Sequence, residues 1–350
     1  MEGVKLAAPS GCSLVAPTGV TVDSSGATWY SYRVNGYSVS QVVPPPLFDP
    51  SKASDSQLEE YDFPVTAIRA ATPQGARLRA LLSKPAKVEI GVASCPNAPI
   101  NAQPQQYNMP TVGPDAYRGY IPSSDWSGIT TVPQGNPYYQ PYQAAFGSYN
   151  QAAYQECNTN ASASTWVGLG GVNGPPLLQA GTTSTNALPA FKFAEFVGLN
   201  GQDIGIPGPT IAAPGDNIVP SIQWVANYPY GDVYSDVWNT TTNVHWFAHM
   251  SLPEAAFDPN FGTSGATADF IDERPSSPRT RTPDPLAEPT FRYVSWLYLD
   301  AEQLNGLFTS YPNFDTFSIL MIQGSNILMY PSDTGSGINN NWNMCGSQGF

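Results

Sequence analysis

Alternating apolar and polar positions near the N-terminus predict a β-hairpin. The runs Thr28–Val34 and Tyr37–Val42 are rich in β-branched and aromatic residues. Asn35 and Gly36 stand between them, and this pair favours the two-residue type I′ turn, which needs positive φ angles. The stretch is therefore expected to form two antiparallel strands that turn at Asn35-Gly36.

Two segments after this hairpin carry helical signals. Ser54–Tyr61 opens with a serine that can cap a helix and has a glutamine three residues later. In Gln74–Ser83 the apolar residues fall near one helical face. The stretch Cys95–Pro122 is rich in Pro, Asn and Gln, and is expected to be a linker or a long loop.

From Ser123 onward the chain consists of short strand-like runs separated by turn residues such as Pro214-Gly215-Asp216. Such a pattern with little helix favours an all-β domain of two antiparallel sheets packed face to face. The expected strands lie at Tyr142–Tyr154, Ser164–Leu169, Leu177–Thr182, Phe191–Val197, Asn217–Val225, Val233–Trp238, Val244–Met250, Thr267–Asp272, Phe291–Leu297 and Phe314–Ile322.

The charge balance narrows the choice of partners. Only 12% of the 350 residues are charged, and the formal net charge is −13. Nucleic acids and anionic membranes reward clustered positive charge, so neither is an expected partner. The chain also lacks a run of 18 apolar residues that could span a membrane, and Met1–Pro17 does not resemble a signal peptide.

Four cysteines, Cys12, Cys95, Cys157 and Cys345, lie far apart, without the Cys-x-x-Cys spacing of a zinc or redox motif. They allow two disulfides in an oxidising compartment, with three alternative pairings, or four buried thiols. Export with partial pairing is the preferred interpretation.

The two histidines suggest little chemistry of their own. His245 and His249 share a face of a strand or a helix, which would suit a metal pair. No third ligand stands nearby and the His-Glu-x-x-His motif is absent, so no metal is expected. A Ser-His-Asp triad also lacks support, because no Gly-x-Ser-x-Gly elbow occurs.

Two segments point to a function when they are taken together. Thr165–Gly171 reads Thr-Trp-Val-Gly-Leu-Gly-Gly and is followed by Leu-Leu-Gln-Ala-Gly at Leu177–Gly181, while Ala268–Pro275 reads Ala-Asp-Phe-Ile-Asp-Glu-Arg-Pro. They resemble the two active-site segments of the eqolisins, or glutamic peptidases, which read roughly W-V-G-I-x-G…L-x-Q-x-G and A-E-W-I-V-E-R-P. In that family a Gln and a Glu share the water that attacks a peptide bond. Ser123–Gly128, Ser-Ser-Asp-Trp-Ser-Gly, resembles the opening of the family's sandwich domain.

The resemblance implies that Gln179 and Asp269 are the catalytic pair. Gln179 would orient the water and stabilise the oxyanion, and strand alternation puts it on the face opposite Leu178 and Ala180. Asp269 stands where the family has Glu and would act as general base and then general acid. The intrinsic pKa values of Asp and Glu are similar, about 3.9 and about 4.3. The shorter reach matters more, because a misplacement near 1 Å can cost on the order of a hundredfold in rate.

Four further residues match family positions. Trp166, Trp126 and Glu195 are implied to bind substrate, and Glu273 is implied to support the site from behind. Trp166 could equally be a core side chain, and Glu195 could equally be a polar residue on an exposed strand face. The alternative is a shift that lets Asp272 or Glu273 serve as the base.

The resemblance implies a concanavalin-like β-sandwich at 123–350, preceded at 1–122 by an N-terminal accessory or pro-segment-like region of the kind found in bacterial eqolisin-like proteins. The implied function is secreted acid endopeptidase activity on a polypeptide substrate, without metal or cofactor. The alternative is an inactive sandwich that serves as a binding or structural module, through self-association or glycan binding.

Overall fold

The computed structural model describes residues 2–5, 11–84, 86–95, 120–132, 141–155, 161–172, 174–185, 188–199, 202–259, 267–275, 288–289, 293–304, 306–313 and 315–343. Strands dominate this part of the chain, and helix is confined in it to four short segments. The expected all-β fold class is confirmed.

One layer of the sandwich, here called the front sheet, consists of seven antiparallel strands. Their spatial order is β15 (Asp203–Ile211), β14 (Leu188–Val197), β13 (Gly174–Thr185), β12 (Ser162–Gly171), β19 (Ala268–Glu273), β9 (Trp126–Val132) and β23 (Asp315–Gln323). The short strand β8 (Tyr120–Ser123) pairs with β23 in parallel. The front sheet thus joins β13 and β19, which are far apart in sequence, through β12.

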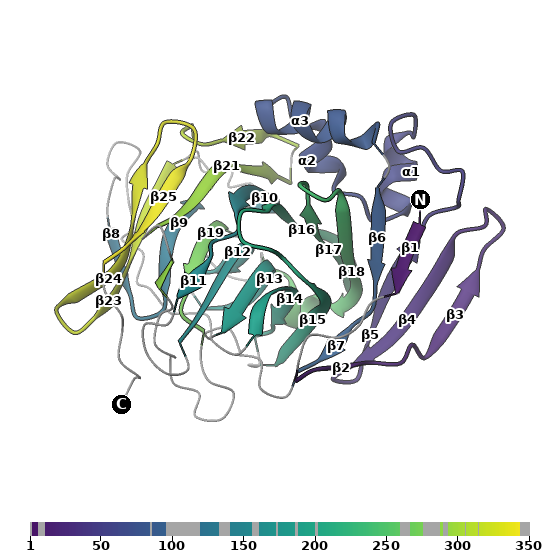
Figure 1. Ribbon diagram of the computed structural model, residues 1–350, viewed down its shortest axis with the longest axis horizontal. Helices are drawn as coiled ribbons and strands as arrows, with labels where there is room; N and C mark the ends of the chain where they lie inside the picture. Colours follow the sequence, from purple (N-terminus) through teal and green to yellow (C-terminus); the bar gives the residue numbers. More distant parts are fainter. Residues whose placement is uncertain are drawn as a thin grey trace.

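The other layer, the back sheet, is also antiparallel. Its order is β21 (Tyr293–Gln303), β10 (Tyr142–Asn150), β16 (Asn217–Asn227), β17 (Tyr230–Asn239) and β18 (Val244–Pro253). Two strands, β24 (Asn326–Asp333) and β25 (Ile338–Trp342), continue the hydrogen bonding from β23 to β21, so the two layers are joined at one edge (Figure 1). Smaller elements are β11 (Tyr154–Gln155), β20 (Glu288–Pro289), β22 (Phe308–Ser310) and α4 (Glu254–Phe257).

The main core lies between the two sheets. The front sheet contributes alternate residues such as Val167, Leu178 and Phe270, and the back sheet contributes others such as Ile222 and Val237, all of them fully buried. Burying this apolar surface is the main favourable term in folding. Because Leu178 and Ala180 face this core, Gln179 faces the other side of the front sheet, as predicted.

The N-terminal region extends the back sheet and covers its outer face. The predicted hairpin is confirmed as β4 (Thr28–Val34) and β5 (Tyr37–Val43), with positive φ at Asn35 and Gly36. Strand β3 (Gly19–Val22) adds to β4, while β6 (Lys87–Ile90) pairs with both β18 and β1 (Glu2–Lys5), in parallel with each.

The predicted helices are also present, as α1 (Asp55–Glu60), with a complete capping box at Ser54, and α3 (Pro73–Leu82). A third, α2 (Val65–Arg69), lies between them. Their apolar side chains pack with Trp238 and Phe247 of the back sheet, and Figure 1 shows the three helices together at one edge of the molecule. The predicted linker spans Cys95–Pro122. Its residues 96–119 lie outside the described residues, whereas Tyr120–Pro122 belong to strand β8. The boundary near residue 122 stays a prediction.

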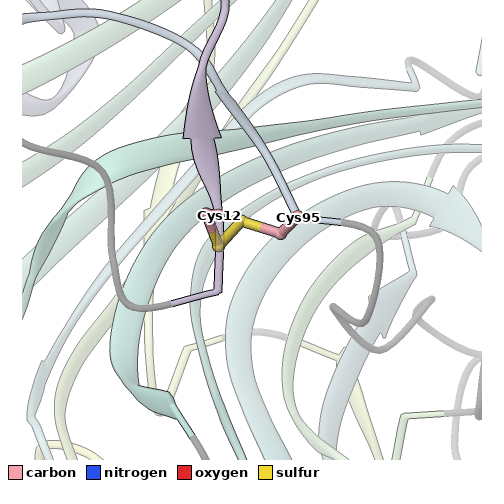
Figure 2. Close-up of a disulfide and its surroundings, with 2 residues drawn as sticks. All are labelled: Cys12 and Cys95. Atoms are coloured by element: carbon pink, nitrogen blue, oxygen red, sulfur yellow. A yellow bond between two sulfur atoms is a disulfide. The ribbon is translucent and has the colours of Figure 1, made fainter.

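One disulfide joins Cys12 to Cys95 (Figure 2). It lies beside the small ladder formed by β2 (Ser13–Leu14) and β7 (Ala93–Ser94), so it ties the two ends of the N-terminal region together. Cys157 and Cys345 lie outside the described residues, so their pairing stays open.

Candidate active site

Gln179 and Asp269 lie in one row across the front sheet, on either side of a glycine. Gly168 of β12 is directly opposite Gln179 of β13 on one flank and directly opposite Asp269 of β19 on the other. Residues that face each other across neighbouring strands project from the same face of a sheet. The two side chains therefore share a face, and Gly168 leaves the position between them without a side chain. The core does not separate them.

Trp166 fills part of the space over Gly168. A Cβ atom placed on Gly168 would lie 2.8 Å from Cζ3 of Trp166, so the six-membered ring of the indole covers this glycine. The indole Nε1 donates to Glu273 Oε2 at 2.6 Å, and Trp126 packs edge-on against the ring with centroids 5.1 Å apart. Glu273 thus fixes the indole from behind, while Trp126 supports it from strand β9.

The amide of Gln179 is oriented by Glu195. Glu195 of β14 is the next residue in the same row, and its Oε2 accepts a hydrogen bond from Gln179 Nε2. The Oε1 atom of Gln179 is buried and has no hydrogen-bond partner among the described residues. Gln179 therefore keeps a free acceptor and a second N–H. Glu195 is only 4% exposed, which rules out a solvent-facing strand residue.

Asp269 is held by two threonine hydroxyls. Thr130 Oγ1, from the next strand of the row, donates to Asp269 Oδ1 at 2.5 Å, and Thr267 Oγ1 donates to Oδ2 at 3.2 Å. Burial raises the pKa of Asp269 to about 8, although both hydrogen bonds act to lower it. Neither threonine was a sequence candidate, because no motif links residue 130 to residue 269.

The alternative base Asp272 belongs to the other face. It lies opposite Thr165, whose hydroxyl donates to it at 2.5 Å, and it also accepts hydrogen bonds from Asn340 and from Trp296 Nε1. Burial raises the pKa of Asp272 to about 6. Because Asp272 points between the layers, it cannot share a water with Gln179. Glu273 is on the same face as Gln179, but its carboxylate accepts the hydrogen bond from Trp166.

Gln179, Asp269 and the side chains around them are closed to solvent in this structure. Gln179, Asp269, Trp166 and Glu273 each have 0% exposure, and Trp126 is equally buried. Phe317 and Ile319 of β23 and Ile121 of β8 belong to the apolar cluster around the two tryptophans. A substrate can reach the row only after the residues over it have moved.

Replacing Gly168 with Ala tests the tight packing at the centre of the row. The new methyl group would meet the Trp166 ring at 2.8 Å and the Leu178 carbonyl oxygen at 3.2 Å. Overpacking of this kind typically costs about 1–3 kcal/mol of stability. Gly205→Ala is the matched control, since Gly205 lies opposite Glu195 in the same row with open space around its Cβ position. Urea unfolding should show a loss for Gly168→Ala and almost none for Gly205→Ala. Equal stabilities would contradict the described packing.

The two histidines lie on the outer face of the back sheet, away from this row. His245 Nδ1 lies 2.9 Å from Asp236 Oδ2, and its ring stacks on Trp238. His249 lies between Asp62 and Asp232, at 3.7 Å and 3.6 Å. Within the described ranges no three His, Cys, Asp or Glu side chains are placed to hold a metal ion. No helix in these ranges is long and apolar enough to cross a membrane.

No protein-family model matches the sequence, and no curated protein matches it. Several solved structures resemble the fold, including three peptidase complexes. Two are complexes of Scytalido-glutamic peptidase, one with a peptide-based transition state analog (17% identity, TM-score 0.46) and one with a transition state analog inhibitor (17%, 0.48). The third is SCP-B, a member of the eqolisin family of peptidases, in complex with the tripeptide Ala-Ile-His (16%, 0.46). Each match covers 63% of this chain and 98% of the other. Likeness at this level assigns no activity to this chain.

Proposed function

We propose that the outer face of the front sheet is the active site of an endopeptidase in which Gln179 and Asp269 act on one water molecule. The observation that carries the proposal is the register, which puts the two side chains on one face and on either side of Gly168. The sequence resemblance to the glutamic peptidases is independent of that geometry and supports the same pair.

The chemistry requires a base, a donor for the oxyanion and a proton for the leaving group. Asp269 takes a proton from water, which attacks the peptide carbonyl, and returns that proton to the leaving amine nitrogen. The free N–H of Gln179 donates to the developing oxyanion, and its Oε1 accepts from the attacking water. Glu195 holds the amide in this orientation, and Trp166 forms one side of the space over Gly168.

The pKa of Asp269 decides the working pH. Burial is the main cause of its rise, while the hydroxyls of Thr130 and Thr267 favour the carboxylate. When the site opens to water the desolvation is relieved, so the two hydroxyls return the pKa toward its ordinary acidic range. The opened enzyme is therefore proposed to work in mild acid.

The proposal also covers the role of residues 1–122, the compartment and the substrate. We propose that 1–122 is an accessory region, since α1–α3 cover the back sheet rather than the row. Export is proposed from the Cys12–Cys95 disulfide, because structural disulfides persist mainly in oxidising compartments. The substrate is proposed to be an unfolded or extended polypeptide.

The test is cleavage of a reduced, alkylated protein by wild type and by Asp269→Asn, each with and without incubation in acid, followed by mass spectrometry. Wild type should produce internal cuts somewhere between about pH 2 and 6, the range in which a carboxyl of ordinary pKa titrates. The isosteric amide cannot accept the proton and should be inactive. If wild type cuts nothing before or after acid treatment, or if the variant cuts equally well, the endopeptidase proposal is wrong. An inactive wild type would favour the binding-module alternative, for which the two threonine bonds simply satisfy a buried carboxyl.

A further inference from the structure

A cavity of about 360 Å³ lies between the N-terminal helices and the outer face of the back sheet. One wall is built by the end of α1 and the start of α2, and the other by strands β10, β16 and β17. Its volume falls in the range typical of small-molecule sites. Partly exposed side chains at Glu59 and Val225 mark where it meets the surface.

Two buried carboxyl groups line this cavity with unused oxygen atoms. Asp62 is 6% exposed and Asp236 is 2% exposed. Asp62 Oδ2 and Asp236 Oδ1 have no hydrogen-bond partner among the described residues. Leaving a buried carboxyl oxygen without a donor costs free energy, so both atoms call for a donor that comes from outside the protein.

The acidic side chains around the cavity favour a positively charged donor. The described residues that line the cavity include Glu59, Asp62 and Asp236 but no Lys or Arg. Burial, together with the nearby charge of Asp236, raises the pKa of Asp62 well above its ordinary value. Burial lowers the pKa of His249, so this ring supplies no standing positive charge near neutral pH. A bound cation would let both carboxyls ionise.

Part of the remaining wall is apolar, although Thr66, Gln143 and Ser221 also line the cavity. Phe63, Pro64 and Ala67 from the helical side face Ala144 and Phe146 from the back sheet. A simple hydrated metal ion would gain nothing from these side chains, whereas an organic cation can bury its carbon skeleton against them.

We propose that this cavity binds a small organic cation, in which an ammonium or guanidinium group contacts Asp62 and Asp236 and an apolar body packs against Phe63 and Phe146. The site lies on the outer face of the back sheet, whereas Gln179 lies on the outer face of the front sheet. The binding proposal is therefore independent of the peptidase proposal and can fail or succeed without it.

The test is isothermal titration calorimetry of the full chain at pH 7.5 with benzylamine, with benzyl alcohol as the uncharged probe of the same shape. The variant is Asp62→Asn. Asp62 has a φ of 58°, a backbone conformation that Asn adopts readily, so the replacement should fold. Glu60→Gln, an exposed position of α1 outside the cavity lining, is the control for net charge.

Benzylamine should bind to wild type and to Glu60→Gln with the same affinity, and at least about tenfold more weakly to Asp62→Asn, the usual effect of losing one charge-assisted hydrogen bond. Benzyl alcohol should bind far more weakly than benzylamine. The proposal is overturned if benzylamine shows no saturable binding, if benzyl alcohol binds as well, or if Asp62→Asn binds benzylamine like wild type.

Discussion

The free energy of unfolding should fall by a few kcal/mol as the pH rises from about 4 to about 8. The cause is Asp269, whose pKa burial raises from 3.8 to about 8, so that the folded state binds a proton more tightly than the unfolded chain does. Stability from such a group is complete below the unfolded pKa and is lost as the pH rises through the folded pKa. One pKa unit corresponds to about 1.4 kcal/mol, so a shift of this size dominates the pH profile.

Other buried carboxyls act in the same direction, and burial is the main cause for Asp62 and Asp236 as well. Burial raises the pKa of Asp272 to about 6 and that of Asp300 to about 7. Asp23 and Asp49 have pKa values lowered to about 2, mainly by hydrogen bonds to Ser25 and Lys52, and oppose the trend only in stronger acid. Because both lie at the surface, their effect is small. The fold should therefore be most stable in mild acid.

Urea unfolding at several pH values between 4 and 8 measures this profile. Asp269→Asn should flatten it, because the amide keeps the shape of the carboxyl and does not titrate. Glu60→Gln, which removes an exposed carboxyl, should leave the slope unchanged. Two results would show that Asp269 is not desolvated in the folded state. One is a wild-type stability that stays constant or rises across this range, and the other is an Asp269→Asn profile as steep as that of wild type.

Removing the amide of Gln179 should reduce kcat by about 10²–10³-fold, the usual effect of losing one oxyanion donor. Because the donor acts on charge that develops only in the transition state, KM should change little. Steady-state hydrolysis of one peptide by Gln179→Ala and wild type measures both constants. Gln323→Ala, a partly exposed glutamine of β23 in the same sheet, is the control and should keep wild-type kinetics. A rise in KM with unchanged kcat would make Gln179 a substrate-binding residue instead.

Local sequence patterns predicted the elements that local chemistry determines. The Asn35-Gly36 turn is specified by two residues that tolerate positive φ, and the structure has φ values of 50° and 88° there. Likewise, alternation along β13 was sufficient to put Gln179 on the face opposite the core. Neither result needed information from distant parts of the chain.

Strand β15 was not predicted, because its sequence carries two prolines and two glycines. These residues are tolerated because β15 pairs with β14 alone among the described strands, and an edge strand has unpaired N–H positions to spare. Gly208 has a further reason, since a Cβ atom there would lie 3.0 Å from the Trp246 ring. Tertiary packing, which the local pattern does not contain, decides this strand.

The residues that hold the candidate catalytic pair in place could not be predicted from the sequence either. Thr130 and Asp269 are 139 positions apart, and Gln179 meets Glu195 only because β13 and β14 are paired in that register. Gly168 looked like one glycine among several, whereas the register makes it the gap between the proposed catalytic side chains. Sequence motifs identified Gln179 and Asp269, whereas strand pairing determines which residues hold them in place.

The central claim is that Gln179 and Asp269 act together on one water. Its most direct test is kcat/KM for one peptide substrate with wild type, Gln179→Ala, Asp269→Asn and the double variant, all after the same acid treatment. When two residues act together in one step, removing either one removes most of the effect of both. The double variant should therefore be no slower than the slower single variant. Losses that multiply in the double variant, or cleavage that survives in Asp269→Asn, would contradict the account.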